Sequence, residues 1–204
     1  MKDMSRGMSL VLAALCLAAS PATGAPKKAC TVGAAEAKAE AARFPHSNYT
    51  TIAWCPEAVP ILIGMLEDED LRQGAAAALR DATTNTATGT WRYDEVQAAA
   101  VPHLAAIAAA TKRLAESKGS MADWGVADML QDVMGGMGKA AVSHLADGLQ
   151  KASAGVRYSA ATNLRKMGVK AATALPALRA ALKNEKDATT AGEIRAAIKA
   201  IEGK

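Results

Sequence analysis

A short motif that occurs four times constrains the fold of this chain more strongly than any other feature. In every copy, alanine and an aliphatic residue precede a proline or a serine, and a leucine stands two positions later. The copies lie at residues 58–62, 100–104, 141–145 and 174–178, and their third positions are 42, 41 and 33 residues apart. Such a period is typical of chains built from stacked supersecondary units, so the sequence predicts a repeat architecture.

Each copy of the motif predicts the start of a helix. Proline is tolerated in the first turn of a helix, because its missing N–H would have no intrahelical partner there. Apolar residues then follow at steps of three and four, which is the spacing of one helical face. They are Ile61, Leu62, Met65 and Leu66 after the first copy, and Leu175, Leu178 and Leu182 in the last.

A polar break and a second helix follow each first helix. In three units the second helix begins with an aliphatic residue and an arginine, namely Arg72, Arg157 or Arg195. Alanines and leucines follow at helical spacing, and the small alanines allow a neighbouring helix to approach closely. We interpret the arginines as a structural ladder, each pairing with acidic residues in the preceding turn. The alternative is a row of positive charge for an anionic partner.

The segment 142–168, VSHLADGLQKASAGVRYSAATNLRKMG, resembles a HEAT repeat, in particular the short type found in bacterial proteins and in phycobilin lyase subunits. The resemblance covers residues 58–204, with a degenerate second unit that has Asp123 in place of the arginine. It implies an all-α fold, a right-handed α-solenoid of about four helix pairs, whose second helices line a concave binding face. The units are residues 58–83, 94–138, 139–168 and 169–204, with 84–93 as an inserted loop.

The first 24 residues have the pattern of a secretory signal peptide. Lys2 and Arg6 precede the apolar run 8–19, and small and turn-prone residues occupy 20–24. The apolar run is too short to span a bilayer as a stable helix. We therefore expect a mature chain that begins near Ala25, lies in the periplasm or outside the cell, and has no membrane span.

The three cysteines of the chain have different expected roles. Cys16 would be acylated in a lipoprotein, but Leu15 stands where that signal needs a small residue, so we assign Cys16 to the apolar run. Cys30 and Cys55 remain, and an even number in an exported chain favours a disulfide. This bond would attach a predicted capping helix at 34–43 to the end of the repeat stack, within an N-terminal region at 25–57.

The concave face and the inserted loop are the expected binding surface. Tryptophan, arginine and tyrosine are enriched at binding hot spots, and insertions in repeat proteins often form the binding face. The alternative role of Trp91 is to cover the edge between two repeats. The expected partner-binding residues are Gln73, Arg80, Trp91, Arg92, Tyr93, Tyr158 and Arg165.

His103 and His144 occupy equivalent positions of consecutive repeats. Two histidines can share a metal, but a zinc site needs a third or fourth ligand, and no motif supplies one. We therefore expect no metal and no other cofactor.

The sequence contains no catalytic motif and no concentrated basic patch. Nucleophile elbows, phosphate-binding glycine loops and Cys–His pairings are missing, and the formal net charge of +4 comes from scattered residues. Nucleic-acid binders carry a clustered positive surface instead. We expect a non-catalytic scaffold that binds a protein partner. The alternatives are an accessory subunit or chaperone for a cofactor-carrying enzyme, as the resemblance to phycobilin lyase subunits implies, and a structural envelope protein.

Overall fold

A computed structural model describes the chain over residues 32–43, 55–84, 93–117, 120–151 and 153–203. Within these ranges the protein is all-helical and has no strand, which confirms the predicted all-α class. The α-helices are α1 (Ala34–Ala41), α2 (Val59–Gly64), α3 (Arg72–Thr84), α4 (Tyr93–Ala100), α5 (Leu104–Ala115), α6 (Met121–Gly136), α7 (Val142–Gly148), α8 (Ala154–Met167), α9 (Leu175–Asn184) and α10 (Ala188–Glu202). Short 3-10 segments are η1 (Pro56–Ala58), η2 (Met65–Glu67), η3 (Val101–His103), η4 (Gly138–Ala141) and η5 (Gly168–Ala174).

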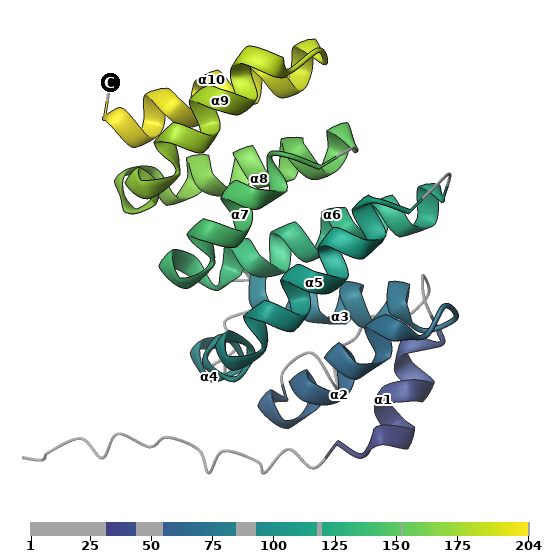
Figure 1. Ribbon diagram of the computed structural model, residues 1–204. Helices are drawn as coiled ribbons and strands as arrows, with labels where there is room; N and C mark the ends of the chain where they lie inside the picture. The colour runs from purple at the N-terminus through teal and green to yellow at the C-terminus, as the bar shows by residue number, and fades with distance from the viewer. Residues whose placement is uncertain (1–31, 44–54, 85–92, 118–119, 152, 204) are drawn as a thin grey trace, which may run out of the picture.

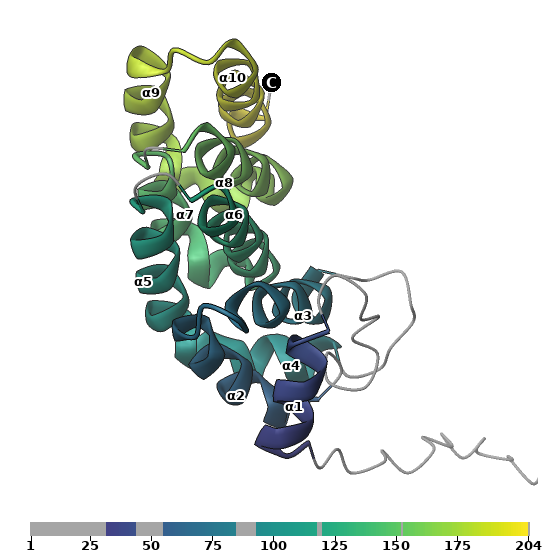
Figure 2. The same ribbon diagram turned by 90° about the vertical axis from the view of Figure 1, so that its right-hand side faces the viewer.

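The helices are arranged in two layers (Figures 1 and 2). The first layer contains α2, α5, α7 and α9, and the second contains α3, α6, α8 and α10. Each second-layer helix packs against the α-helix that precedes it in the chain, and α3, α6 and α8 each also pack against the next second-layer helix. The order of the units along the chain is therefore also their order in space.

All four copies of the motif lead into a first-layer helix. Three copies begin at the last residue of a 3-10 segment, which is η1, η4 or η5. The second copy begins at Ala100, the last residue of α4, and contains the whole of η3, so Pro102 lies before α5 and not in its first turn. Pro60 and Pro176 lie in the first turns of α2 and α9, as predicted from their missing N–H groups.

The core between the layers consists mostly of alanine and leucine. Leu79, Leu130, Leu164 and Ile194 are fully buried at the centres of the four second-layer helices. Alanine has a short side chain, so helices in contact through it approach closely. This explains how an aromatic-poor chain buries a continuous core.

Caps at the helix ends follow local sequence signals. The side chain of Asp187 accepts a hydrogen bond from the backbone N–H of Thr190 and caps the start of α10. The side chain of Ser120 accepts one from the backbone N–H of Asp123 and caps the start of α6. The predicted glycine cap after Met167 has φ +55°, the positive value for which glycine is suited, although its ψ of −136° lies outside the left-handed helical region.

The N-terminal helix α1 packs against α3 and α2. Ala37 and Ala41 are buried in this contact, and the backbone approaches Gly74 so closely that an added Cβ would lie 1.9 Å from the carbonyl oxygen of Ala41. Cys55 is buried at the start of η1. Its predicted partner Cys30 and the predicted signal peptide lie outside the described residues, so the disulfide and the export signal remain predictions. Among the described residues, no helix has both the length and the apolar character needed to cross a membrane.

Candidate functional site

The second helices are joined by polar side chains that cross from one helix to the next. Between α6 and α8, the hydroxyl of Ser159 donates to Asp128, and Nδ2 of Asn163 donates to Oδ1 of Asp132 at 3.0 Å. Between α8 and α10, Nε of Arg165 donates to Oε1 of Glu193 at 2.6 Å. These contacts link α6, α8 and α10 through polar and charged side chains.

One carboxyl group in this layer has a shifted pKa. Burial raises the pKa of Asp128 above its usual value, and the hydrogen bond from Ser159 and the charge of Arg80 oppose that effect. The charge of Asp132 acts in the same direction as burial. The charge of Arg80 on α3 therefore acts on the pKa of Asp128 on α6. Because Asp128 also accepts a hydrogen bond from Ser159 on α8, these residues connect three consecutive second helices.

Four of the predicted binding residues lie on described second helices. Gln73 and Arg80 are half-buried and seven residues apart on α3, so they share one side of that helix. Tyr158 and Arg165 have the same separation on α8, where Tyr158 is 39% exposed. The hydrogen bond to Glu193 raises the pKa of Arg165, and the neighbouring Tyr158 acts in the same direction. We call Arg80, Asp128, Tyr158, Arg165 and Glu193 the second-helix face.

The remaining predicted binding residues belong to the inserted loop. Trp91 and Arg92 lie outside the described residues, and Tyr93 is described only as the first residue of α4. Their role in binding remains a prediction.

Two of the three arginines of the predicted ladder pair with carboxylates, and their main acceptors differ from those expected. Arg195 is exposed and has no carboxylate partner among the described residues. Nη1 of Arg72 lies 2.9 Å from Oδ1 of Asp123, whereas Glu69 in the preceding turn is 3.7 Å away. Arg157 binds Glu185, which precedes α10. The expectation of pairing within the preceding turn holds only for the longer contact of Arg72 with Glu69, because the closest carboxylates come from the next helix pair. Asp123, which replaces the arginine in the degenerate second unit, accepts a hydrogen bond from Arg72 of the first unit.

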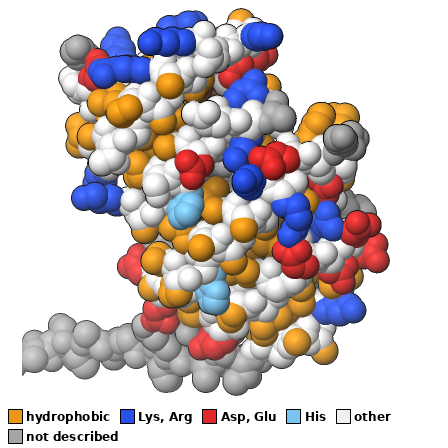
Figure 3. Space-filling model, viewed as in Figure 1, with side chains coloured by type: hydrophobic (Ala, Val, Ile, Leu, Met, Phe, Trp, Pro, Cys, Tyr) orange, Lys and Arg blue, Asp and Glu red, His pale blue; other side chains and the backbone are white. Residues whose placement is uncertain are grey.

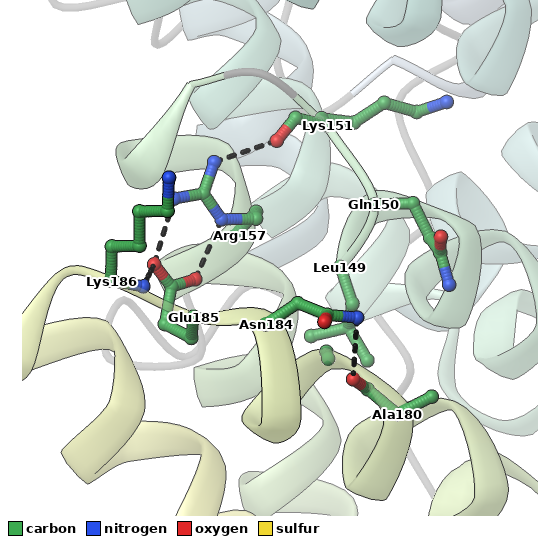
Figure 4. Close-up of a pocket in the computed structure, with 9 residues that line it drawn as sticks. Leu149, Gln150, Lys151, Arg157, Ala180, Asn184, Glu185 and Lys186 are labelled. Carbon is green, nitrogen blue, oxygen red and sulfur yellow. Dashed lines mark hydrogen bonds and ion pairs between the residues drawn. The ribbon is translucent and has the colours of Figure 1, made fainter.

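A pocket of about 400 Å³ lies beside the second of these pairs, between the start of α8 and the end of α9 (Figure 4). The guanidinium of Arg157 donates to both oxygens of Glu185, at 2.6 and 2.9 Å, and to the carbonyl oxygen of Lys151 at 2.7 Å. Because these donors are directed at groups of the chain itself, Arg157 joins two loops rather than offering its charge to a ligand. Lys186 and Gln150 complete the polar lining.

The first-helix layer presents acidic and basic side chains and histidine among small hydrophobic ones (Figure 3). His103 and His144 are both half-buried in this layer, on η3 and α7. Across the described ranges, no three histidine, cysteine or carboxylate side chains are grouped as metal ligands would be.

Sequence reasoning missed the polar contacts between second helices. Their signal was present, because Asp128 and Asp132 are four residues apart, and so are Ser159 and Asn163. Residues four apart share one face of a helix, so each of these pairs presents two polar side chains on the same side of its helix.

No family model, no curated protein and no solved structure matches this chain.

Proposed function

We propose that this chain is an exported scaffold of HEAT-like repeats that binds a protein partner and catalyses no reaction. In this proposal the helix pairs form a right-handed α-solenoid, and the second helices line its concave face. The two-layer packing, the recurrence of the motif at the start of each first-layer helix and the repeat spacing support this architecture. The cleaved leader would place the protein in the periplasm or outside the cell.

The observation that carries the proposal is the exposed pair of Tyr158 and Arg165 on α8. Tyrosine and arginine are the side chains that most often contribute strongly to binding between proteins. Arg165 is held by Glu193, although its side chain remains 42% exposed. A side chain that is ordered before binding loses less conformational entropy when the partner arrives. The second-helix face therefore combines suitable residue types with preorganisation.

A second candidate function is that of an accessory subunit for a cofactor-carrying enzyme. The pocket beside Arg157 favours it, since about 400 Å³ is within the range of small-ligand sites. A chromophore or other cofactor that copurifies with the protein would support this alternative.

Affinity capture from the envelope fraction of the source cells tests the proposal. The tagged parent should retain a specific protein, and a variant with Tyr158→Ala and Arg165→Ala should lose it. The matched control changes Val101 and Arg179 to alanine in η3 and α9. Val101 is 40% exposed, and Arg179 forms an exposed pair with Glu202 at 2.7 Å. Loss of the captured protein in both variants, or in neither, would contradict binding at the second-helix face.

A further inference from the structure

A groove of about 320 Å³ lies where three consecutive second helices end. Its walls come from the last residue of α3, the last two residues of α6 and the end of α8. The segments η4 and η5, which lead to the next first-layer helices, complete it. The groove adjoins the second-helix face, because Oγ1 of Thr84 donates to the carbonyl oxygen of Arg80 at 2.7 Å and Lys166 follows Arg165 in the chain.

Three lysines line this groove, and no carboxylate does so among the described residues. They are Lys139 of η4, Lys166 of α8 and Lys170 of η5, and all three are exposed. None forms an ion pair within the part of the chain that the structure describes, whereas every described arginine except Arg195 pairs with a carboxylate. The groove therefore concentrates positive charge that the described residues do not compensate.

The helix ends account for only one of these lysines. Lys166 stands in the last turn of α8, where a positive charge stabilises the carbonyl groups at the helix end. Lys139 and Lys170 lie beyond the ends of α6 and α8, and the attraction of a charge to a helix end falls off within the last turn. Stabilisation of helix ends therefore explains Lys166 and leaves the other two charges unexplained.

A buried amide at the same groove adds a hydrogen-bond acceptor. Asn163 lines the groove and is 5% exposed, and its Nδ2 donates to the carbonyl oxygens of Gln131 and Ser159 and to Oδ1 of Asp132. Its own Oδ1 accepts no hydrogen bond from any described residue, but unlike Oε1 of Gln131 it is not fully enclosed. Gly135 leaves the space for this oxygen, because a Cβ there would lie 2.2 Å from it. The groove therefore combines positive charge with an acceptor.

We propose that this groove binds an acidic peptide segment of the protein partner. The proposal rests on the proposed function, since it specifies what the partner presents beside the second-helix face. Side-chain carboxylates of the segment lie near the three lysines, and a backbone N–H donates to Oδ1 of Asn163. A peptide supplies both groups, because each residue except proline has an N–H donor. The phosphates of a nucleic acid backbone supply acceptors alone.

Fluorescence anisotropy of a labelled hexaglutamate peptide tests this assignment on the purified protein. The parent should bind the peptide, and added salt should weaken binding through screening of the charges. The variant Lys139→Gln, Lys166→Gln, Lys170→Gln should bind about tenfold more weakly, because it lacks all three charges of the groove. A labelled hexaglutamine peptide, which has the same backbone without the carboxylates, should show no binding to the parent.

A matched variant separates the groove from the net charge of the protein. Lys38→Gln, Lys112→Gln, Lys183→Gln removes the same charge from exposed lysines of α1, α5 and α9, and it should bind the peptide like the parent. Equal weakening in both triple variants would overturn the proposal, because net charge alone would then explain binding. Absence of an anisotropy change with the parent, or tighter binding of a labelled thymidine hexanucleotide than of the peptide, would overturn it as well.

The peptide experiment uses the protein without its partner, so its failure is distinct from a failure of the proposed function. A captured partner provides the second test. If Tyr158→Ala, Arg165→Ala loses the partner while the groove variant retains it with parent affinity, the acidic segment is excluded and binding at the second-helix face stands. Weaker binding of the partner by the groove variant, with an unchanged melting temperature, is the expected result.

Discussion

Arg157 and Glu185 form a two-point ion pair that joins the start of α8 to the segment before α10. The two guanidinium nitrogens lie 2.6 and 2.9 Å from the two carboxylate oxygens. The side chain of Glu185 is 1% exposed and that of Arg157 is 19% exposed. A pair so well shielded from water couples two consecutive helix pairs through their loops.

Removal of one partner from this pair should destabilise the protein. Arg157→Ala leaves the carboxylate of Glu185 buried without its main donor, and we expect a loss of about 3 kcal/mol in the free energy of unfolding. Arg179→Ala breaks an exposed pair and should cost no more than about 0.5 kcal/mol. Urea denaturation of the two variants measures the difference. Equal losses in the free energy of unfolding would show that the shielded Arg157–Glu185 pair contributes no more than the exposed pair.

The same pair predicts a dependence of stability on pH. The hydrogen bonds from Arg157 lower the pKa of Glu185 to about 2 from its usual 4.5. Because the folded-state pKa is depressed, the stabilisation is complete above the unfolded-state value and is lost as pH falls from about 5 to about 2. The contribution is about 3 kcal/mol, at about 1.4 kcal/mol for each pKa unit.

Glu185→Gln provides the comparison for that pH dependence. This variant cannot titrate at position 185, so its free energy of unfolding should fall less steeply than that of the parent over the same acidic range. Urea titrations at several pH values measure the two slopes. Parallel slopes would mean that Glu185 has an ordinary pKa in the folded protein.

The contact between α1 and α3 depends on the absence of a side chain at Gly74. A Cβ would meet the backbone of Ala41 at 1.9 Å, and a backbone atom cannot rotate away. Gly74→Ala should therefore displace α1 and lower the free energy of unfolding by about 2 kcal/mol. Hydrogen exchange in α1 should become faster while exchange in α8 and α10 stays unchanged.

Gly192→Ala is the matched control for Gly74→Ala. Gly192 lies inside α10, and an added Cβ would meet no atom within 4 Å. Alanine there should stabilise the helix by about 0.5–1 kcal/mol, because glycine loses more conformational freedom on folding. Destabilisation by both substitutions would contradict the steric explanation.

The predicted disulfide can be tested by replacing both cysteines. Cys55 is buried beside the first helix pair, so a bond to Cys30 would attach the N-terminal region to the repeats. Closing a loop of about 25 residues stabilises a protein by roughly 3 kcal/mol in the chain-entropy model. We expect the double variant Cys30→Ser, Cys55→Ser to melt at a lower temperature than the parent under oxidising conditions. If both proteins melt at the same temperature after reduction but not before it, the difference is due to the bond.

The helices could be predicted from the sequence because their signals are local. Pro60 and Pro176 mark helix starts through their own backbone, and Gly168 marks an end through its φ angle. The partners of the arginines could not be predicted in this way. Glu185 is 28 residues from Arg157, and only the register between consecutive helix pairs brings the two together.

The burial of Gln131, which is 1% exposed on α6, illustrates the same limit. Nothing in the sequence around Gln131 distinguishes it from a solvent-exposed glutamine, and its burial depends on Gly148, a residue of the next helix pair. By contrast, the exposure of Tyr158 and Arg165 could be predicted from the repeat pattern, because that pattern assigns one side of α8 to the core and leaves the other exposed. Their role in binding remains a prediction.

The central claim, that the second-helix face binds a protein partner, is tested most directly by the dissociation constant of a captured partner. The parent should be compared with Tyr158→Ala, Arg165→Ala and with the control Val101→Ala, Arg179→Ala, all three with unchanged melting temperatures. We predict at least tenfold weaker binding by the first variant, a loss of about 1.4 kcal/mol, and parent-like binding by the control. Equal affinity of all three proteins would contradict the claim.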